Sequence, residues 1–162
     1  ELLEAAGCEV VVPQAQTCCG QPGWNSGDRP SARKLALKLL DEFAGCDYLV
    51  IPSGSCAGMI KRHYADVFEG DEGQLARVRH LAGRTHELTD FLCNILKCEA
   101  FPGKYEGAVT YHDACSGLRE LGVKAQPREL LALAGGGITG FQGIVMVGHR
   151  PVSPRAAQRR TN

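Results

Sequence analysis

Residues 8–28, CEVVVPQAQTCCGQPGWNSGD, contain a short β-branched run, a proline and then two adjacent cysteines followed by glycine. The run at 8–13 has the composition of a buried strand, and its proline ends that strand. On a regular strand Cys18 and Cys19 would face opposite sides, so we place them in a loop. Gly20 gives that loop the freedom to turn both sulfurs to one side. The stretch therefore predicts a strand that leads into a loop with two cooperating thiols.

The rest of the chain repeats this order of strand, cysteine-containing loop and helix. Further buried strands are predicted at 47–52 and 107–113. Apolar spacing predicts helices at 29–45, 59–68, 72–82 and 86–97, followed by two short helical pieces broken at Pro127. This alternation predicts an α/β fold, a parallel sheet with flanking helices and with cysteine loops at the carboxyl ends of strands.

Length and composition exclude several classes of protein. The 162 residues are 44% hydrophobic and 22% charged, which is typical of one soluble globular domain. A formal net charge of zero gives no indication of a nucleic-acid partner. No apolar run reaches the roughly 18 residues of a transmembrane helix. The first residues carry acids and no basic start, so they are not a signal peptide, and we expect a cytoplasmic protein.

Eight cysteines in such a chain indicate metal or redox chemistry rather than a disulfide framework, which needs a secreted context. Four of them follow predicted strands: Cys18, Cys19, Cys56 and Cys115. The carboxyl ends of parallel strands meet at one edge of a sheet, so these thiols are expected to converge there. Helix N-termini at that edge favour thiolates, the form that binds metal. Neighbouring glycines let the backbone approach a bulky cluster.

The other four cysteines fit a structural role better. Cys8 and Cys46 stand at the starts of buried strands, where free cysteine is a common small apolar residue. Cys93 and Cys98 are five residues apart on a predicted helix and would point about 140° apart. We therefore expect packing or surface positions for this second pair rather than a shared site.

Three motifs, TCCGQPGWNSG, PSGSCAGM and YHDACSGLRELGVKAQPRELL, resemble the cysteine-rich CCG-domain family in the family's order. The most similar branch is the iron-sulfur subunit of bacterial lactate- or glycolate-oxidising complexes. The resemblance implies that Cys18, Cys19 and Cys56 are metal ligands of a first CCG repeat and that Cys115 opens a second. It implies a 4Fe-4S cluster, with zinc in some members, and the other subunits of the oxidising complex as partners.

The resemblance also divides the chain into three parts. Residues 1–105 correspond to a first CCG repeat without its N-terminal part, and residues 106–137 to the truncated start of a second. Residues 138–162 hold four arginines and no acid, whereas residues 1–137 hold fourteen Lys and Arg against eighteen Asp and Glu. We expect this atypical tail to be disordered and to pack poorly.

The function expected from these features is electron transfer within a 2-hydroxy-acid oxidising complex, without an independent catalytic centre. Two alternatives remain at this point. One is a zinc-binding structural or interaction module, and the other is a thiol-disulfide redox protein similar to heterodisulfide reductase. Since the first repeat offers three thiols and a cubane cluster usually takes four, we expect that the chain alone does not hold a stable cluster.

Overall fold

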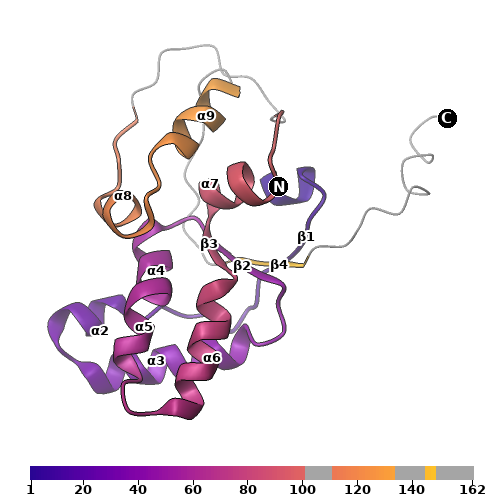
Figure 1. The fold of residues 1–162 in the computed structure, drawn as a ribbon. Helices are drawn as coiled ribbons and strands as arrows, with labels where there is room; N and C mark the ends of the chain where they lie inside the picture. Colours follow the sequence, from indigo (N-terminus) through magenta and orange to yellow (C-terminus); the bar gives the residue numbers. More distant parts are fainter. Residues whose placement is uncertain (101–110, 134–144, 149–162) are drawn as a thin grey trace.

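The computed structural model describes residues 1–100, 111–133 and 145–148, the last four by their main chain alone. Its sheet has the order β1-β4-β2-β3, formed by Glu9–Val11, Val145–Gly148, Tyr48–Ile51 and Thr85–Glu87. β2 and β3 are parallel, whereas β4 runs antiparallel to both β1 and β2. β1, β2 and β3 therefore share one direction and end at the same edge of the sheet. The predicted α/β class is confirmed (Figure 1).

Helices occupy most of the remaining described residues. The predicted helices at 29–45 and 72–82 are found as α3 (Arg29–Glu42) and α6 (Glu72–Gly83), and both begin at an aspartate cap, Asp28 and Asp71. The others are α1 (Leu2–Ala5), α2 (Gln21–Ser26), α4 (Gly54–Gly58), the π-helical turn η1 (Met59–His63), α5 (Tyr64–Val67), α7 (Leu88–Asp90), the π-helical turn η2 (Phe91–Ile95), α8 (Cys115–Leu121) and α9 (Ala125–Leu133).

Alternating residues of β2 form two apolar cores, one on each face of the sheet. Leu49 and Ile51 pack with apolar residues of α3, α4, η1, α5 and α6. Val50 faces the other way and packs with residues of α1, η2 and α9. Figure 1 shows α3, α5 and α6 on one side of the sheet and α1, α7 and α9 on the other. Burial on both faces explains the continuous apolar run of β2.

The structure corrects the prediction of one helix over 86–97, because its first residues belong to β3. Thr85 and Glu87 are polar but buried, and local hydrogen bonds satisfy both side chains. The Thr85 hydroxyl donates to the Leu81 carbonyl at 2.8 Å, and the Glu87 carboxylate accepts from the Thr89 and Asp90 backbone N–H groups. A three-residue strand of polar residues carries no apolar pattern, so it cannot be predicted from hydrophobic periodicity.

Three further expectations concern the C-terminal third. Most of the third strand predicted at 107–113 lies outside the described residues, and residues 111–113 have no regular structure. Within the tail predicted to be disordered, Val145–Gly148 forms β4 between β1 and β2, which therefore are not direct neighbours. Pro127 does not break the last helix, because it lies in the first turn of α9, where its missing N–H is tolerated.

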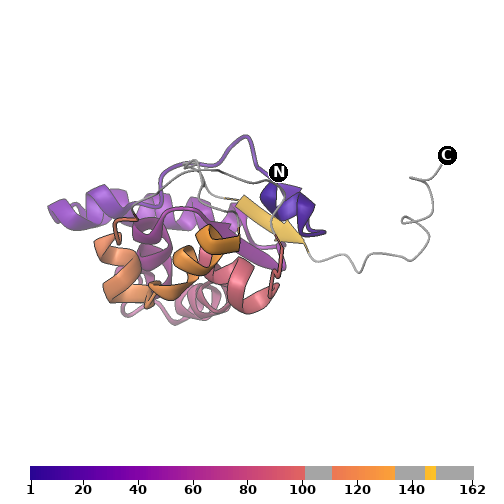
Figure 2. The same ribbon diagram turned by 90° about the horizontal axis from the view of Figure 1, so that it is seen from above.

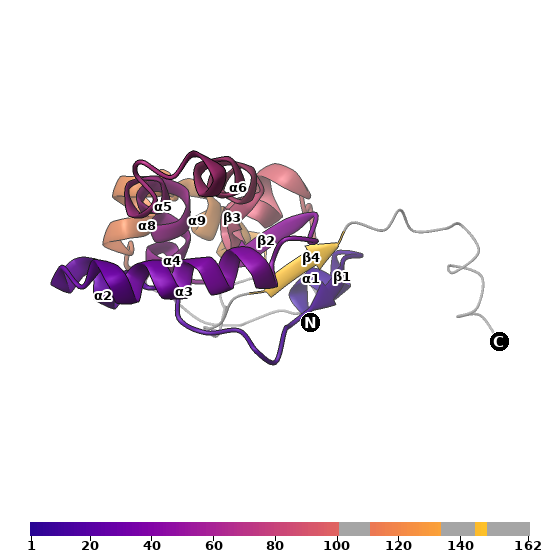
Figure 3. The same ribbon diagram turned by 90° about the horizontal axis from the view of Figure 1, so that it is seen from below.

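Two short helices that are distant in the sequence, α4 and α8, are in direct contact. A Cβ atom built on Gly54 of α4 would lie 2.8 Å from the Gly117 Cα of α8, so only glycine permits this approach. α2 and α3 run almost end to end below them (Figure 3). None of the described helices is long and apolar enough to cross a membrane.

Replacing Gly54 by alanine is expected to destabilise the protein by about 1–3 kcal/mol, because the new methyl group would overlap the α8 backbone. Urea unfolding monitored by circular dichroism measures this loss. Gly83→Ala is the matched control, since Gly83 is also helical and has open space around the built Cβ. That variant should be neutral or slightly more stable. Equal stability of the two variants would contradict the close packing of α4 on α8.

Candidate metal centre

The paired-cysteine loop ends at Gly20, which caps α2 in a left-handed conformation with φ of 86°. A Cβ atom there would lie 3.0 Å from the Ala32 carbonyl oxygen, so the loop also packs tightly on α3. This confirms that a glycine is required directly after the pair. The two cysteines differ in exposure: Cys19 is buried with 1% of its surface exposed, while Cys18 is exposed.

Cys56 meets Cys19 from the other side of the site. It lies in α4, directly after β2, and its sulfur accepts a hydrogen bond from the Cys19 thiol. This bond, together with hydrogen bonds from Ser53 and Ser55, lowers the pKa of Cys56 to about 6. The same bond and burial raise the pKa of Cys19, which keeps its proton. The pair is therefore one thiolate and one thiol at neutral pH.

Tyr64 fixes the backbone of this pair. It is fully buried, and its hydroxyl donates to the Cys19 carbonyl at 2.8 Å. Negative charge on Cys19, Cys18 and Cys56 contributes to a raised Tyr64 pKa, after the larger effect of burial. The phenol is thus near all three sulfurs and remains protonated.

A π-helical turn explains how Tyr64 comes to the same side as Cys56. In a regular α-helix, residues eight positions apart are about 80° apart around the axis. η1 lies between the two residues, and its wider turn reduces the rotation per residue. Such turns are frequent at functional sites. No sequence pattern indicates η1, so Tyr64 cannot be recognised from the sequence as part of this site.

Cys115 is at the same sheet edge but not in this group. It is the first residue of α8, whose Gly117 contacts Gly54 of the helix that carries Cys56. Its side chain is exposed, and no described residue forms a hydrogen bond with it. The structure thus brings Cys19 into contact with Cys56, leaves Cys18 beside them and places Cys115 on the adjoining helix. Among the described residues, no three Cys, His, Asp or Glu side chains are arranged to hold a metal ion.

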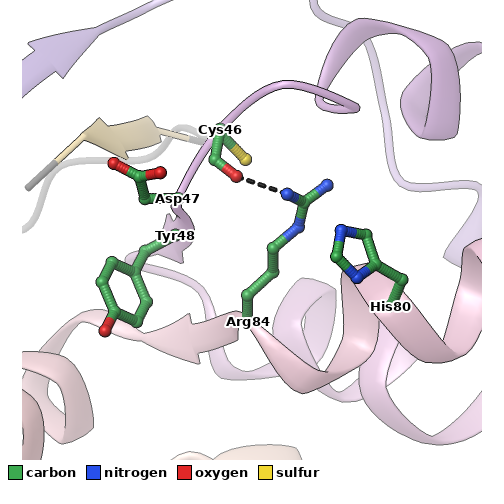
Figure 4. A pocket seen from close by; sticks show the side chains of 5 residues that line it. All are labelled: Cys46, Asp47, Tyr48, His80 and Arg84. Atoms are coloured by element: carbon green, nitrogen blue, oxygen red, sulfur yellow. Dashed lines mark hydrogen bonds between the residues drawn. The ribbon is translucent and has the colours of Figure 1, made fainter.

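The pocket shown in Figure 4 lies at the opposite end of β2 and contains none of the four predicted ligands. It has a volume of about 620 Å³ and is lined by Cys46, Asp47, Tyr48, His80 and Arg84. The Arg84 guanidinium donates to the carbonyls of Phe43, Ala44 and Cys46, where α3 ends. A cation at a helix C-terminus is stabilising, so we assign Arg84 a structural role.

Comparison with known proteins first defines the class of the domain that carries this site. Residues 1–61 match the family model of the cysteine-rich CCG domain. This segment includes the paired-cysteine loop, β2 and Cys56. The family resemblance expected from the three motifs is therefore confirmed.

Individual relatives give a more specific comparison than the family model does. The chain is similar to "Lactate utilization protein A" of Geobacillus kaustophilus (strain HTA426), with 47% identity over 131 residues that cover 81% of this chain and 54% of the relative. The protein of that name from Anoxybacillus flavithermus (strain DSM 21510 / WK1) is 44% identical, over a segment that covers 81% of this chain and 55% of the relative. "Lactate utilization protein A 2" of Bacillus cereus (strain AH820) is 41% identical, over a segment that covers 82% of this chain and 54% of the relative. The chain thus spans about half the length of these curated relatives, and no solved structure matches it.

Tyr64→Phe is expected to cost about 1–3 kcal/mol of stability, because it leaves the buried Cys19 carbonyl without its donor. Thermal unfolding of the metal-free chain measures the loss. Tyr48→Phe is the control, since the Tyr48 hydroxyl has no hydrogen-bond partner among the described residues, and it should change stability by less than about 0.5 kcal/mol. Similar losses in both variants would contradict the role of the Tyr64 hydroxyl.

In the metal-free chain, alkylation of Cys56 is expected to follow thiolate formation with a midpoint near pH 6. Cys19→Ala should move the midpoint upward, because it removes the hydrogen bond that lowers the Cys56 pKa most. Mass spectrometry of iodoacetamide-treated protein between pH 5 and 9 gives the profile of each peptide. Cys46, whose pKa is raised by burial, is the internal reference and should react only at higher pH. A Cys56 midpoint that Cys19→Ala leaves unchanged would refute the S–H···S contact.

Proposed function

We propose that this chain contributes thiolate ligands to an iron-sulfur cluster that transfers electrons in a lactate-utilisation system. The observation that carries the proposal is the contact between Cys19 and Cys56, which are 37 positions apart in the sequence but adjacent at the carboxyl edge of the sheet. Residues 1–105 would be the first CCG repeat and residues 106–137 the start of the second. Cys18, Cys19 and Cys56 would be ligands of the first site, and Cys115 a ligand of the second.

The donor set fits a cluster in its chemistry. Cys56 is already prepared as a thiolate, and the Gln21 backbone N–H, which lowers the Cys19 pKa, adds a donor that would stabilise negative charge on that sulfur. Cys18 is exposed and makes no hydrogen bond to described residues, so rotation of its side chain towards the pair meets no bond that must break. These three thiols are one fewer than a cubane cluster usually takes.

Such a cluster, when bound, would supply one-electron redox chemistry. The residues of this chain would determine its surroundings. Buried Cys19 and the apolar core beneath it would limit solvent access, and the Ser53 and Ser55 hydroxyls would donate to the Cys56 sulfur. Hydrogen bonds and exclusion of water are the protein's means of adjusting a reduction potential.

Lactate as the source of the electrons rests on the names of the relatives. In this proposal, the partners are the other subunits of a lactate- or glycolate-oxidising complex, and the chain works in the cytoplasm as an electron-transfer component rather than as an independent catalyst.

One observation favours a second candidate function, dithiol exchange. A low-pKa cysteine in contact with a buried thiol is the arrangement used in thiol-disulfide chemistry, where the thiolate attacks and the partner resolves the mixed disulfide. In that case Cys56 would be the attacking residue and Cys19 the resolving one. A zinc module would use the same sulfurs with a further ligand.

Anaerobic reconstitution with iron and sulfide tests the proposal. The chain alone should hold little iron after desalting, whereas excess 2-mercaptoethanol, a small thiol that can act as the fourth ligand, should allow uptake with a visible absorbance shoulder. Cys18→Ala, Cys19→Ala and Cys56→Ala should each lower the bound iron at least several-fold. Cys46→Ala is the matched control and should retain it, because Cys46 is a buried cysteine far from this edge, at the start of β2.

Other outcomes of this experiment would support one of the two alternative functions. One zinc per chain without iron uptake would favour the structural module. Disulfide reductase activity without metal, lost in Cys56→Ala, would favour dithiol exchange. Iron bound equally well by the three cysteine variants and by wild type would contradict the proposed ligands.

A further inference from the structure

A second group of cysteines lies on the other face of the sheet, away from the candidate metal centre. Cys8 is buried in the core that Val50 shares with Phe91 and Leu130, and Cys93 and Cys98 pack against the same core. They come from the start of β1, from η2 and from the residues after η2. Cys93 and Cys98 thus occupy packing positions, as expected, and both lie against the same core.

Cys93 and Cys98 do not lie on one regular helix, because the helical segment ends at η2. Lys97 has a left-handed backbone with φ of 51°, which is uncommon for a residue with a side chain. The turn lets the Cys98 N–H donate to the Leu92 carbonyl at 3.0 Å, so the chain reverses as at many helix C-termini. Cys98 is therefore turned back onto the core. The segment that follows η2 runs beside α1 in two perpendicular views (Figures 1 and 2).

The three cysteines of this group, Cys8, Cys93 and Cys98, differ in their contacts and in their exposure. The Cys93 sulfur donates to the Gln126 carbonyl of α9 at 3.5 Å, and burial and nearby acids, first Glu129, raise the Cys93 pKa to about 11. Charge on Cys98 contributes to the raised pKa of both Cys8 and Cys93, so the Cys98 sulfur lies near both of the other sulfurs. The Cys98 pKa is raised by burial alone, and its side chain is more exposed than that of Cys8. Cys98 is thus partly exposed, Cys8 is buried, and the sulfur of Cys93 is already engaged with the α9 carbonyl of Gln126.

We propose that Cys8 and Cys98 are a reversible disulfide-forming pair that links the start of β1 to the end of η2 under oxidising conditions. The oxidant is a low-molecular-weight aliphatic disulfide. The Cys98 thiolate attacks one of its sulfurs, which breaks the S–S bond and releases a thiolate that takes up a proton. The Cys8 thiol loses its proton and attacks the Cys98 sulfur of the mixed disulfide, which releases a second small thiol. Two protein thiols are oxidised, and one small disulfide is reduced to two thiols.

A disulfide between Cys8 and Cys98 would attach the α1 end of the chain more firmly to the core. α1 is a single short helix, and it is attached through Leu3 and Cys8 to the core that contains Phe91 and Leu92. A link between residues 8 and 98 would close a loop that includes β1, β2, β3 and the candidate metal centre. Closing a long loop restricts the unfolded chain, so the oxidised form should be the more stable one. This inference does not depend on metal binding.

Peptide mapping tests the pairing directly. The metal-free chain is incubated with glutathione disulfide, free thiols are blocked at low pH, and the protein is digested with proteases that cut after Glu and after Lys or Arg. The three cysteines then fall into separate peptides, 5–9, 88–97 and 98–99. A disulfide between 5–9 and 98–99 is expected, and reduction should remove it. A bond between 88–97 and 98–99, or only glutathione adducts on Cys8 and Cys98, would overturn the proposal.

Variants separate this bond from oxidation at Cys19 and Cys56. In a Cys56→Ala background, which cannot form a Cys19–Cys56 bond, the protein should show a Tm higher by several degrees after oxidation, and dithiothreitol should reverse the shift. Cys98→Ala should abolish that rise, and because Cys98 is only partly buried the variant should still fold. Cys93→Ala and Cys46→Ala should retain the rise. An oxidation-dependent shift that persists in Cys98→Ala would contradict the pairing even if Cys8→Ala did not fold.

Discussion

The buried hydrogen bond from the Tyr64 hydroxyl to the Cys19 carbonyl holds the paired-cysteine loop against the helix that carries Cys56. The residues between β1, which ends at Val11, and Gly20 form no helix or strand, so the loop is held by this bond, by the burial of Cys19 and by the packing of Gly20 on α3. Tyr64 reaches the loop only because η1 turns it to the side of Cys56. The low Cys56 pKa is caused first by the Cys19 thiol, and the Tyr64 hydroxyl holds the backbone of Cys19.

The sheet provides the second condition for the site. β1, β2 and β3 point in one direction, so the cysteines that follow β1 and β2 meet at one edge although they are distant in sequence. The direct contact of Gly54 with Gly117 adds α8, and with it Cys115, to that edge. The opposite face of the sheet carries a separate thiol group at Cys8, Cys93 and Cys98. One domain therefore combines two sets of cysteines in different surroundings, one polar and partly ionised and one apolar and protonated.

Sequence patterns predicted the parts of this fold that depend on apolar periodicity and on glycine. β2, α3 and α6 follow from apolar spacing, and the turn at Gly20 follows from placing two adjacent cysteines in a loop rather than on a strand. The patterns could not predict β3, whose buried polar residues are satisfied locally. They gave no indication of η1 or of the left-handed turn at Lys97, because both depend on tertiary packing. Tyr64 and the position of Cys98 were missed for that reason.

The central claim, that Cys18, Cys19 and Cys56 bind one metal together, is tested most directly by counting thiolates around a probe ion. Cadmium binds thiolates and gives an ultraviolet charge-transfer absorbance that grows with the number of sulfur ligands. Titration of the reduced chain should give one tight cadmium site whose absorbance falls by about a third in each single alanine variant of these cysteines and is unchanged in Cys46→Ala. A tight site whose absorbance is the same in Cys56→Ala as in wild type would contradict the claim.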